Sequence, residues 1–210
     1  MLERSLELFL KEKGVEESNT QVIFEITLSN LLETGELDEQ DFMDRARILS
    51  SLGYKVLISN FKEYYRLAEY FSNYTKAQMG MVMGVDNLIA IFREEYYKHL
   101  SGGILEAFGK LFYRDIKIYL YPMKDKRTGE IITSNNIEVP SRTRELYKFF
   151  KFDGDEKVVD IEGYDPKNLD IHSREIVEQI KRGEDGWQSS LPKGVAQMIE
   201  ENGFFGWIKK

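Results

Sequence analysis

Cysteine is absent from the 210-residue sequence, and histidine occurs only twice, as His99 and His172. Without cysteine the chain forms no disulfide, carries no thiolate nucleophile and offers no cysteine ligand to a metal. Two histidines are too few for a histidine-rich metal centre. These absences exclude disulfide scaffolds and thiol chemistry, and they predict a protein without a metal site of its own.

Long hydrophobic runs and an excess of positive charge are absent too. No apolar run approaches the roughly 18 residues that a membrane-spanning helix needs, and the acidic start, MLERSLELFLKEKG, is unlike a signal peptide. The formal net charge is −7, whereas a general nucleic-acid binder needs a basic face for the phosphates. We therefore expect a cytoplasmic protein with no membrane and no nucleic-acid partner. A pocket for one small nucleotide remains compatible with this charge.

What is present is the composition of an ordinary globular protein. Hydrophobic residues make up 42% of the chain and charged residues 31%, so a sizeable core can form. The aromatic residues are numerous, and most are expected in packing because large rings bury area efficiently. The length suits one generous domain or a domain with appendages.

The middle of the chain alternates short apolar runs with amphipathic segments. The runs at 54–60, 77–84 and 115–123 are typical of strands, and the first two are predicted to be buried on both faces. Strands that alternate with helical segments indicate βαβ units and a mainly parallel sheet. Right-handed crossovers would place helices on both faces of that sheet. The predicted fold class is therefore α/β, Rossmann-like and doubly wound, with a helical C-terminal tail.

Three segments are expected along the chain. Residues 1–53 form a mixed segment packed on the core, in which 21–35 is ambiguous between strand and helix. The α/β core spans 54–164 and includes a polar excursion or hairpin at 123–140. The tail, 165–210, holds two helices. Serines predict two helix starts, with Ser141 and Ser173 as N-caps.

The segment GVDN, at the carboxyl end of the second predicted strand, is the first candidate site. In open α/β sheets, ligands bind outside the carboxyl ends of the strands. Gly84 would allow close approach of a ligand, and Asp86 and Asn87 offer groups for sugar hydroxyls or a base edge. Asn60 ends the neighbouring run and is a further candidate. The alternative, which these residues alone favour, is that Asp86 or Asn87 caps the next helix and Gly84 serves the turn.

The second candidate is the segment His172-Ser173-Arg174, at the start of a predicted helix. Free backbone N–H groups at a helix start can hold a phosphate, and Arg174 could add a charge-assisted contact. His172 is the one histidine near such an anion site. The alternative is an ordinary serine N-cap beside a solvated arginine.

Taken in order, these two stretches resemble a known enzyme family. An apolar strand ends in G-x-D-N-L within MVMGVDNLIAIF, and a late I-x-S-x-x-I segment, DIHSREIV, is followed by SLPKGVAQMIEENGFFGW. This order resembles the second half of the nicotinate/nicotinamide mononucleotide adenylyltransferases, which belong to the nucleotidylyltransferase superfamily and have a Rossmann-like fold. The resemblance covers about residues 61–207 and extends to a bacterial subfamily with VLISN, GVDNL and GGILEAFG segments.

The resemblance implies a role in NAD biosynthesis, the transfer of AMP from ATP, with its Mg²⁺, to NMN or nicotinate mononucleotide. It implies that Asp86 and Asn87 contact the ribose or nicotinamide portion, that Ser173 and Arg174 contact the phosphates, and that His172 is an extra donor. The catalytic H-x-G-H motif of the superfamily is absent from the chain. The sequence therefore favours nucleotide binding over catalysis, leaves enzymatic activity open and assigns no catalytic residue.

Two other interpretations stay open. The absent H-x-G-H motif and the aromatic segment FKEYYRLAEYF favour a non-catalytic interaction or regulatory module on the same fold. An unrelated phosphate- or sugar-handling enzyme could instead use Asn60 and Asp86 at neighbouring strand ends. A homo-oligomer, or an upstream domain in a longer chain, is compatible with each interpretation.

Overall fold

The computed structural model describes residues 1–27, 39–152 and 156–208. The chain divides into two compact units. Unit 1 comprises Met1–Thr20 and Glu63–Asp165, and unit 2 comprises Gln21–Lys62 and Pro166–Lys210. Both units contain helices and a parallel sheet, which confirms the α/β class.

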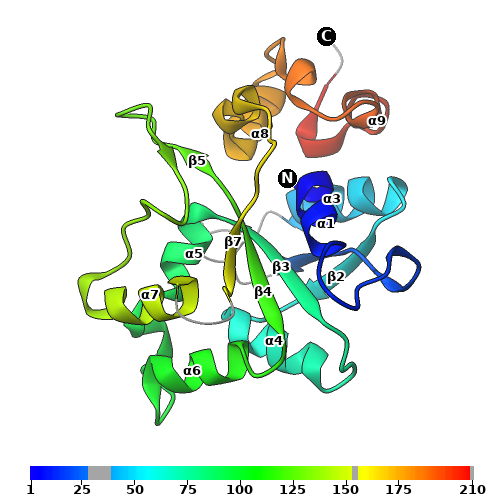
Figure 1. The fold of residues 1–210 in the computed structure, drawn as a ribbon. Coiled ribbons are helices and arrows are strands. Elements are labelled where there is room, and N and C mark those ends of the chain that lie inside the picture. Colours follow the sequence, from blue (N-terminus) through cyan, green and yellow to red (C-terminus); the bar gives the residue numbers. More distant parts are fainter. Residues whose placement is uncertain (28–38, 153–155, 209–210) are drawn as a thin grey trace. The chain divides into compact units, whose positions relative to one another are not determined.

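Unit 1 is built on a parallel three-stranded sheet (Figure 1). Its strands are β3 (Met79–Gly84), β4 (Ile116–Tyr121) and β7 (Val158–Asp160), in the order β3-β4-β7. Because β4 is central, it pairs with both neighbours, and its alternate residues face opposite sides of the sheet.

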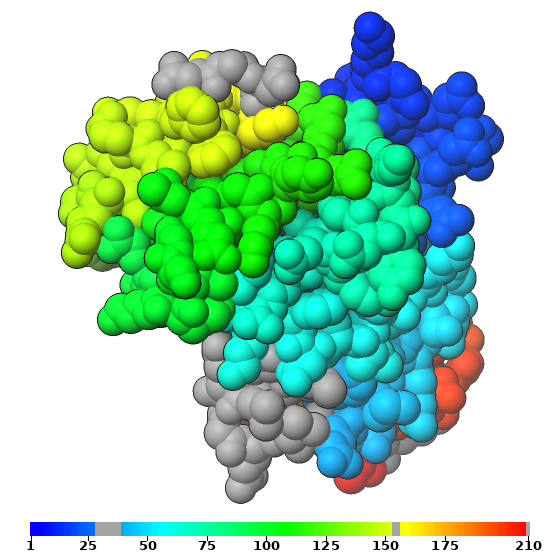
Figure 2. Space-filling model, turned by 90° about the horizontal axis from the view of Figure 1, so that it is seen from below, coloured from blue at the N-terminus to red at the C-terminus, as the bar shows by residue number. Residues whose placement is uncertain are grey.

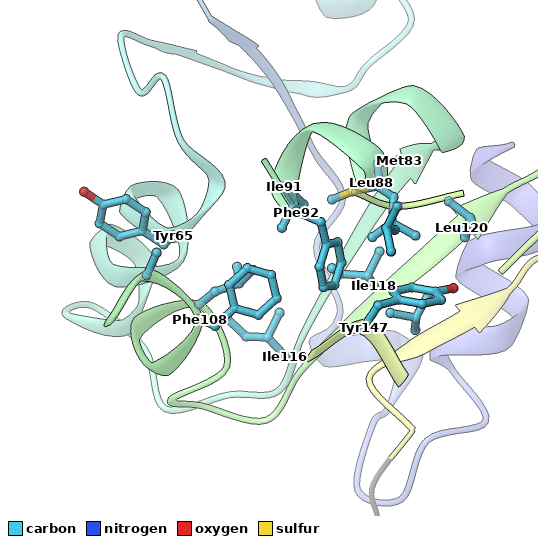
Figure 3. Packing of buried hydrophobic residues seen from close by; sticks show 14 of the residues in the cluster. Tyr65, Met83, Leu88, Ile91, Phe92, Phe108, Ile116, Ile118, Leu120 and Tyr147 are labelled. Atoms are coloured by element: carbon cyan, nitrogen blue, oxygen red, sulfur yellow. The ribbon is translucent and has the colours of Figure 1, made fainter. Parts of the chain in front are cut away.

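Four helices supply the main core on one side of this sheet. They are α4 (Tyr64–Ser72), α5 (Val85–Ile91), α6 (Gly103–Leu111) and α7 (Arg144–Phe152). Figure 3 shows their apolar side chains gathered with those of β4; fully buried members are Leu88, Ile91, Phe92, Phe108, Ile116, Ile118 and Leu120. The ring of Phe92 lies 4.9 Å from that of Phe108 and 5.2 Å from that of Tyr147, centroid to centroid. The predicted amphipathic segments thus pack as helices, although the one after β3 ends early and continues as a 3-10 turn, Glu94–Tyr97.

The opposite side of the sheet is contacted by α1 (Leu2–Phe9). Phe9 packs edge-on against Tyr119 of β4, with 6.2 Å between ring centroids. Gly80 is required at this point, because a Cβ there would lie 2.8 Å from Tyr119 Cε2 and 3.0 Å from Phe9 Cδ2. Beyond α1, the carboxylate of Glu12 lies 2.8 Å from Lys117 Nζ and accepts a hydrogen bond from the Tyr119 hydroxyl at 3.1 Å.

The expected polar excursion is an antiparallel hairpin of β5 (Met123–Lys124) and β6 (Ile131–Ile132). The turn after it is held at the end of β7, where Asp160 accepts from the Ser134 amide at 2.8 Å and the Ser134 hydroxyl at 2.6 Å. The Tyr147 hydroxyl donates to the Ser134 carbonyl at 2.5 Å. A 3-10 turn, Ser141–Thr143, then leads into α7. Ser141 therefore starts this turn and is not the predicted cap.

Unit 2 contains a parallel pair of strands, β1 (Ile23–Thr27) and β2 (Lys55–Ser59), joined through α3 (Glu39–Ser51). The ambiguous segment 21–35 is thus a strand in its first half, and its second half lies outside the described residues. The prediction of strands buried on both faces is wrong in each unit, because Ile58 is 51% exposed and Val82 is 39% exposed. Each of these strands pairs on one side only among the described strands.

The core of unit 2 is helical. It is formed by α3, α8 (Ser173–Arg182) and α9 (Val195–Asn202), with 3-10 turns at Trp187–Ser190 and Phe204–Gly206. Two further 3-10 turns, Glu17–Asn19 in unit 1 and Pro166–Asp170 in unit 2, complete the described helical elements. The buried apolar residues of this core are Ile48, Ile176, Ile180, Trp187, Val195, Ile199, Phe204 and Phe205.

The units do not coincide with the three segments expected from the sequence. Residues 21–62 belong with 166–210, and residues 1–20 belong with 63–165. The reason is a set of contacts between residues distant in the chain: Asp44 of α3 accepts from the Phe205 amide at 2.7 Å, and Phe9 packs on Tyr119. Such pairings leave no signal in local sequence patterns.

Candidate functional site

The carboxyl ends of the three parallel strands in unit 1 form one edge of the sheet. Gly84, Tyr121 and Asp160 are the last residues of β3, β4 and β7. The strand register sets Gly84 beside Tyr121. This is the edge at which ligands bind in open parallel sheets, and it includes the predicted GVDN segment.

Gly84 is the N-cap residue of α5, with φ −86° and ψ 171°. This is extended backbone that any residue can adopt. A Cβ built on Gly84 meets no atom within 4 Å, in contrast to the crowded position of Gly80. Within the described residues, neither backbone conformation nor packing demands glycine at this position.

Asp86 and Asn87 lie in the first turn of α5 and are exposed. No side chain caps this helix, so the prediction that Asp86 or Asn87 serves as its N-cap is wrong. Among the described residues, neither side chain takes part in a hydrogen bond or an ion pair. The negative charge of Asp86 near the helix start stabilises α5 by about 0.3–1 kcal/mol, but this effect leaves both side chains available at the strand edge.

Two tyrosines complete this edge. Tyr121 is half-buried and its ring lies 6.0 Å from that of Tyr164, edge to face. Burial raises the pKa of Tyr121, and the neighbouring Tyr164 and Asp165 raise that pKa further. The raised pKa keeps the Tyr121 hydroxyl neutral, and this residue is the strand neighbour of Gly84.

Asp160 has a structural role. Its carboxylate accepts three hydrogen bonds: two from Ser134, and one from the Asn135 side-chain amide at 3.3 Å. These bonds anchor the turn after β6 to the end of β7. Asp160 borders the candidate site, but its acceptor capacity is largely used by this turn.

The remaining predicted residues lie in unit 2. His172 is the N-cap of α8 without a side-chain capping bond, and Ser173 is the first helical residue, so the prediction of Ser173 as the cap is wrong. Ser173 and Arg174 are exposed, and the exposed Asn60 follows β2. Gly84, Asp86 and Asn87 therefore belong to one unit, while Asn60 and the segment from His172 to Arg174 belong to the other.

Sequence reasoning missed Tyr121 as the strand neighbour of Gly84, and it missed Tyr164 and Asp160, which lie next to β4. Tyr121 closes an apolar run just before Pro122, which marks a strand end in the sequence. No local pattern, however, identifies which strand ends are adjacent in the sheet. That information resides in the pairings of β4 with β3 and β7.

The described residues contain no group of three or more histidine, aspartate or glutamate side chains that could hold a metal ion. In the same part of the chain, no helix combines the length and the apolar character required to cross a membrane. Comparisons of the chain with protein-family models, with curated proteins and with solved structures gave no match.

Proposed function

We propose that unit 1 binds a nucleotide at the carboxyl edge of its parallel sheet. The single observation that carries this proposal is the pair Asp86 and Asn87, which are exposed at the strand end and do not cap α5. Gly84, with no atom within 4 Å of its Cβ position, supports close approach of the ligand. The proposed fold is Rossmann-like and doubly wound; its support is a parallel sheet with α1 on one face and α4 to α7 on the other.

The chemistry of these side chains suits the sugar and base of a nucleotide. A carboxylate accepts hydrogen bonds from ribose hydroxyls, and an amide both donates and accepts. The rings of Tyr121 and Tyr164 offer faces on which a planar base or nicotinamide could stack. The phosphate contacts that the resemblance implies for His172, Ser173 and Arg174 concern unit 2 and are proposed separately from the site of unit 1. The resemblance also implies AMP transfer from Mg-ATP as the reaction if the protein is active. Binding is proposed here without an assigned catalytic residue.

Titration calorimetry with ATP, NMN and NAD, supported by thermal shift, tests this function. We expect at least one nucleotide to bind, and Asp86→Ala with Asn87→Ala to weaken its binding about tenfold or more, because lost hydrogen bonds to charged groups cost about 1.5–3 kcal/mol each. Gly84→Ser is the matched variant: serine is a better N-cap than glycine, so it should keep or raise thermal stability while it obstructs the ligand. Absence of any shift at millimolar nucleotide would refute the proposal.

A non-catalytic interaction module on the same fold is the second candidate. The observation that favours it is a set of large apolar side chains exposed on helices and the turns that follow them in unit 1: Tyr74, Tyr96, Leu105, Tyr113, Phe149 and Phe152. Clustered apolar exposure marks interaction sites. Light scattering over a concentration series distinguishes this candidate, since a nucleotide-binding monomer would show no change of mass.

A further inference from the structure

The strand edge of unit 1 offers hydrogen-bonding groups and aromatic rings, but the residues assigned to it include no cation. These residues are 84–87, Tyr121 and Tyr164, and Asp86 adds a negative charge. The predicted phosphate contacts at 172–174 belong to unit 2. Arginine and lysine are the side chains that bind phosphate groups most strongly. A nucleotide phosphate at this edge therefore needs a cation from another element of unit 1.

Helix α1 of unit 1 extends along the sheet to this edge. Its last residue, Phe9, packs in the first half of β3, where a Cβ at Gly80 would lie 3.0 Å from the Phe9 ring. Its third residue, Arg4, lies against Gly163, which follows the end of β7 by three residues. The start of α1 is therefore at the carboxyl ends of the strands, and its end is toward their amino ends. Figure 2 shows the N-terminal segment (blue) at the surface, next to green segments of unit 1.

Gly163 connects Arg4 to the residues of the strand edge. Nε of Arg4 lies 3.7 Å from the position of a Cβ on Gly163. The next residue, Tyr164, has its ring 6.0 Å from that of Tyr121, centroid to centroid, and Tyr121 is the strand partner of Gly84. Neighbouring strands lie about 4.8 Å apart. Arg4, the two tyrosines and Gly84 thus follow one another along one border of unit 1.

The Arg4 guanidinium has donors available for an anion. Its Nη1 donates to both carboxylate oxygens of Glu7, at 2.9 and 3.1 Å. Within the residues that the structure describes, Nε and Nη2 form no hydrogen bond, and the side chain is 49% exposed. A guanidinium can bind two phosphate oxygens side by side through such a pair of nitrogens. Gly163 has φ +68°, which favours glycine, and this residue has no side chain that could cover Nε.

We propose that Arg4 binds a phosphate group of the nucleotide at this edge and so selects phosphorylated ligands over nucleosides. This role rests on the proposed function of unit 1. A role in stability explains Arg4 poorly, because its ion pair with Glu7 is exposed on both sides and such pairs contribute little. The start of α1 lies at the same edge, and the dipole of a helix favours an anion at that end.

Titration calorimetry with two matched ligand pairs, AMP with adenosine and NMN with nicotinamide riboside, tests this role. For at least one pair, the natural chain should bind the nucleotide about tenfold or more tightly than the nucleoside. Arg4→Gln should weaken the nucleotide about tenfold and leave the nucleoside unchanged, because only the nucleotide loses hydrogen bonds to a charged group. Glutamine is a good helix former and keeps the Cδ that contacts Gly163, so the thermal stability should equal that of the natural chain.

Two further variants separate a phosphate contact from a general effect of charge. Glu7→Gln releases Nη1 of Arg4 and should strengthen nucleotide binding by up to about fivefold, opposite to the effect of Arg4→Gln. Arg142→Gln is the matched control, since it removes the same charge from a different part of unit 1. Arg142 pairs there with Glu94 at 3.2 Å and is 83% exposed. Its replacement should leave the affinities for nucleotide and nucleoside unchanged.

The role of Arg4 is overturned by any of three results. These are an Arg4→Gln variant with unchanged nucleotide affinity, an equal loss for nucleotide and nucleoside, and an equal effect of Arg142→Gln. Asp86→Ala with Asn87→Ala tests the proposed function separately, since it should weaken nucleotide and nucleoside alike. If this double variant weakens binding and Arg4→Gln does not, the strand-edge site stands and the role of Arg4 fails. Absence of binding by all four ligands overturns both.

Discussion

The hydrophobic cores of the two units are built from different secondary-structure elements. Unit 1 buries one face of a three-stranded sheet under four helices, and its core contains strand residues such as Ile116, Ile118 and Leu120. Unit 2 has a two-stranded sheet whose Ile23 and Ile58 are exposed, and the buried residues of its core come from helices and turns. In unit 1 the pairings of β4 with β3 and β7 satisfy backbone groups of the sheet while its apolar side chains pack on the helices. A core of helices and turns must also satisfy the backbone groups of those turns.

In unit 2, Asp44 provides the acceptor for a backbone amide of such a turn. Its side chain is fully buried, accepts from the Phe205 amide at 2.7 Å and from the Gln40 side chain at 2.6 Å. Phe205 has φ 55°, a left-handed conformation that is unfavourable for a residue with a Cβ. The buried carboxylate holds this turn closed, so that the Phe205 ring enters the core. Unit 1 contains no comparable buried carboxylate among its described residues.

The largest expected effect is in the sheet core of unit 1. Phe108→Ala removes a ring that contacts Phe92, Phe112 and Phe150, and we expect a loss of about 3–5 kcal/mol of unfolding free energy. Urea denaturation measures this loss. Leu105→Ala on the same helix is the control, because Leu105 is 66% exposed and its truncation leaves no cavity. Equal losses for the two variants would show that Phe108 is not a core residue.

The next largest effect is expected at Asp44, the buried carboxylate of unit 2. Asp44→Ala leaves the Phe205 amide and the Gln40 side chain without their acceptor, and we expect a loss of about 3 kcal/mol. Asp44→Asn keeps one acceptor oxygen and should lose less. Hydrogen exchange at the Phe205 amide reports the bond directly, with faster exchange in both variants. A neutral Asp44→Ala variant would mean that apolar contacts alone hold this turn.

Substitution of two glycines of β3, Gly80 near its start and Gly84 at its end, should change the unfolding free energy by smaller and unequal amounts. Gly80→Ala places a methyl group against the rings of Tyr119 and Phe9, and we expect a loss of about 1–3 kcal/mol from overpacking. Gly84→Ala meets no neighbouring atom and should leave the unfolding free energy within about 0.5 kcal/mol of the natural chain. Thermal denaturation of both variants gives the comparison. A loss at Gly84 as large as that at Gly80 would contradict the open space assigned to Gly84.

The smallest effects are pH-dependent and have opposite signs in the two units. Burial raises the pKa of Glu25 in unit 2 above 4.5, although its hydrogen bond from the Ser59 hydroxyl acts in the other direction. A raised carboxyl pKa contributes stability below the unfolded pKa, and this contribution is lost as pH rises through the folded value. Glu25→Gln should therefore stabilise the protein at neutral pH, and the gain should vanish in acid. Thermal melting from pH 4 to 7, a range that covers the titration of glutamate, measures it.

Glu106 in unit 1 shows the reverse behaviour. The Gly102 amide, and then the Lys110 side chain, lower the pKa of Glu106 by hydrogen bonding to its carboxylate. The stability from this interaction is present above the unfolded pKa, 4.5, and is lost as pH falls through the folded value. Glu106→Gln should destabilise the protein at neutral pH, with a difference that shrinks in acid. If both glutamine variants changed stability with the same sign, the electrostatic contrast between the units would be wrong.

Much of the local structure could be predicted from the sequence. The apolar runs ending at Ser59, Gly84 and Tyr121 are strands, the amphipathic segments between them are helices, and the hairpin lies within 123–140. These features depend on periodicity and turn residues that act over a few positions. The sequence also located Gly84, Asp86 and Asn87 at a strand end. It failed for the capping roles of Ser141, Ser173 and the Asp86-Asn87 pair, because a shift of one to three residues at a helix start exchanges a cap for a first-turn position.

The sequence by itself determined the α/β class, the order of strands and helices and the position of GVDN after β3. Only the tertiary structure decided that β3, β4 and β7 form one sheet, that Tyr121 lies beside Gly84, that Asp160 pairs with Leu120 at the same edge, and that residues 21–62 join 166–210 in a separate unit. The physical reason is the range of the interactions. Helices and strands follow from neighbours in the chain, whereas sheet pairing and core membership depend on contacts, such as that of Asp44 with Phe205, between residues far apart in the sequence.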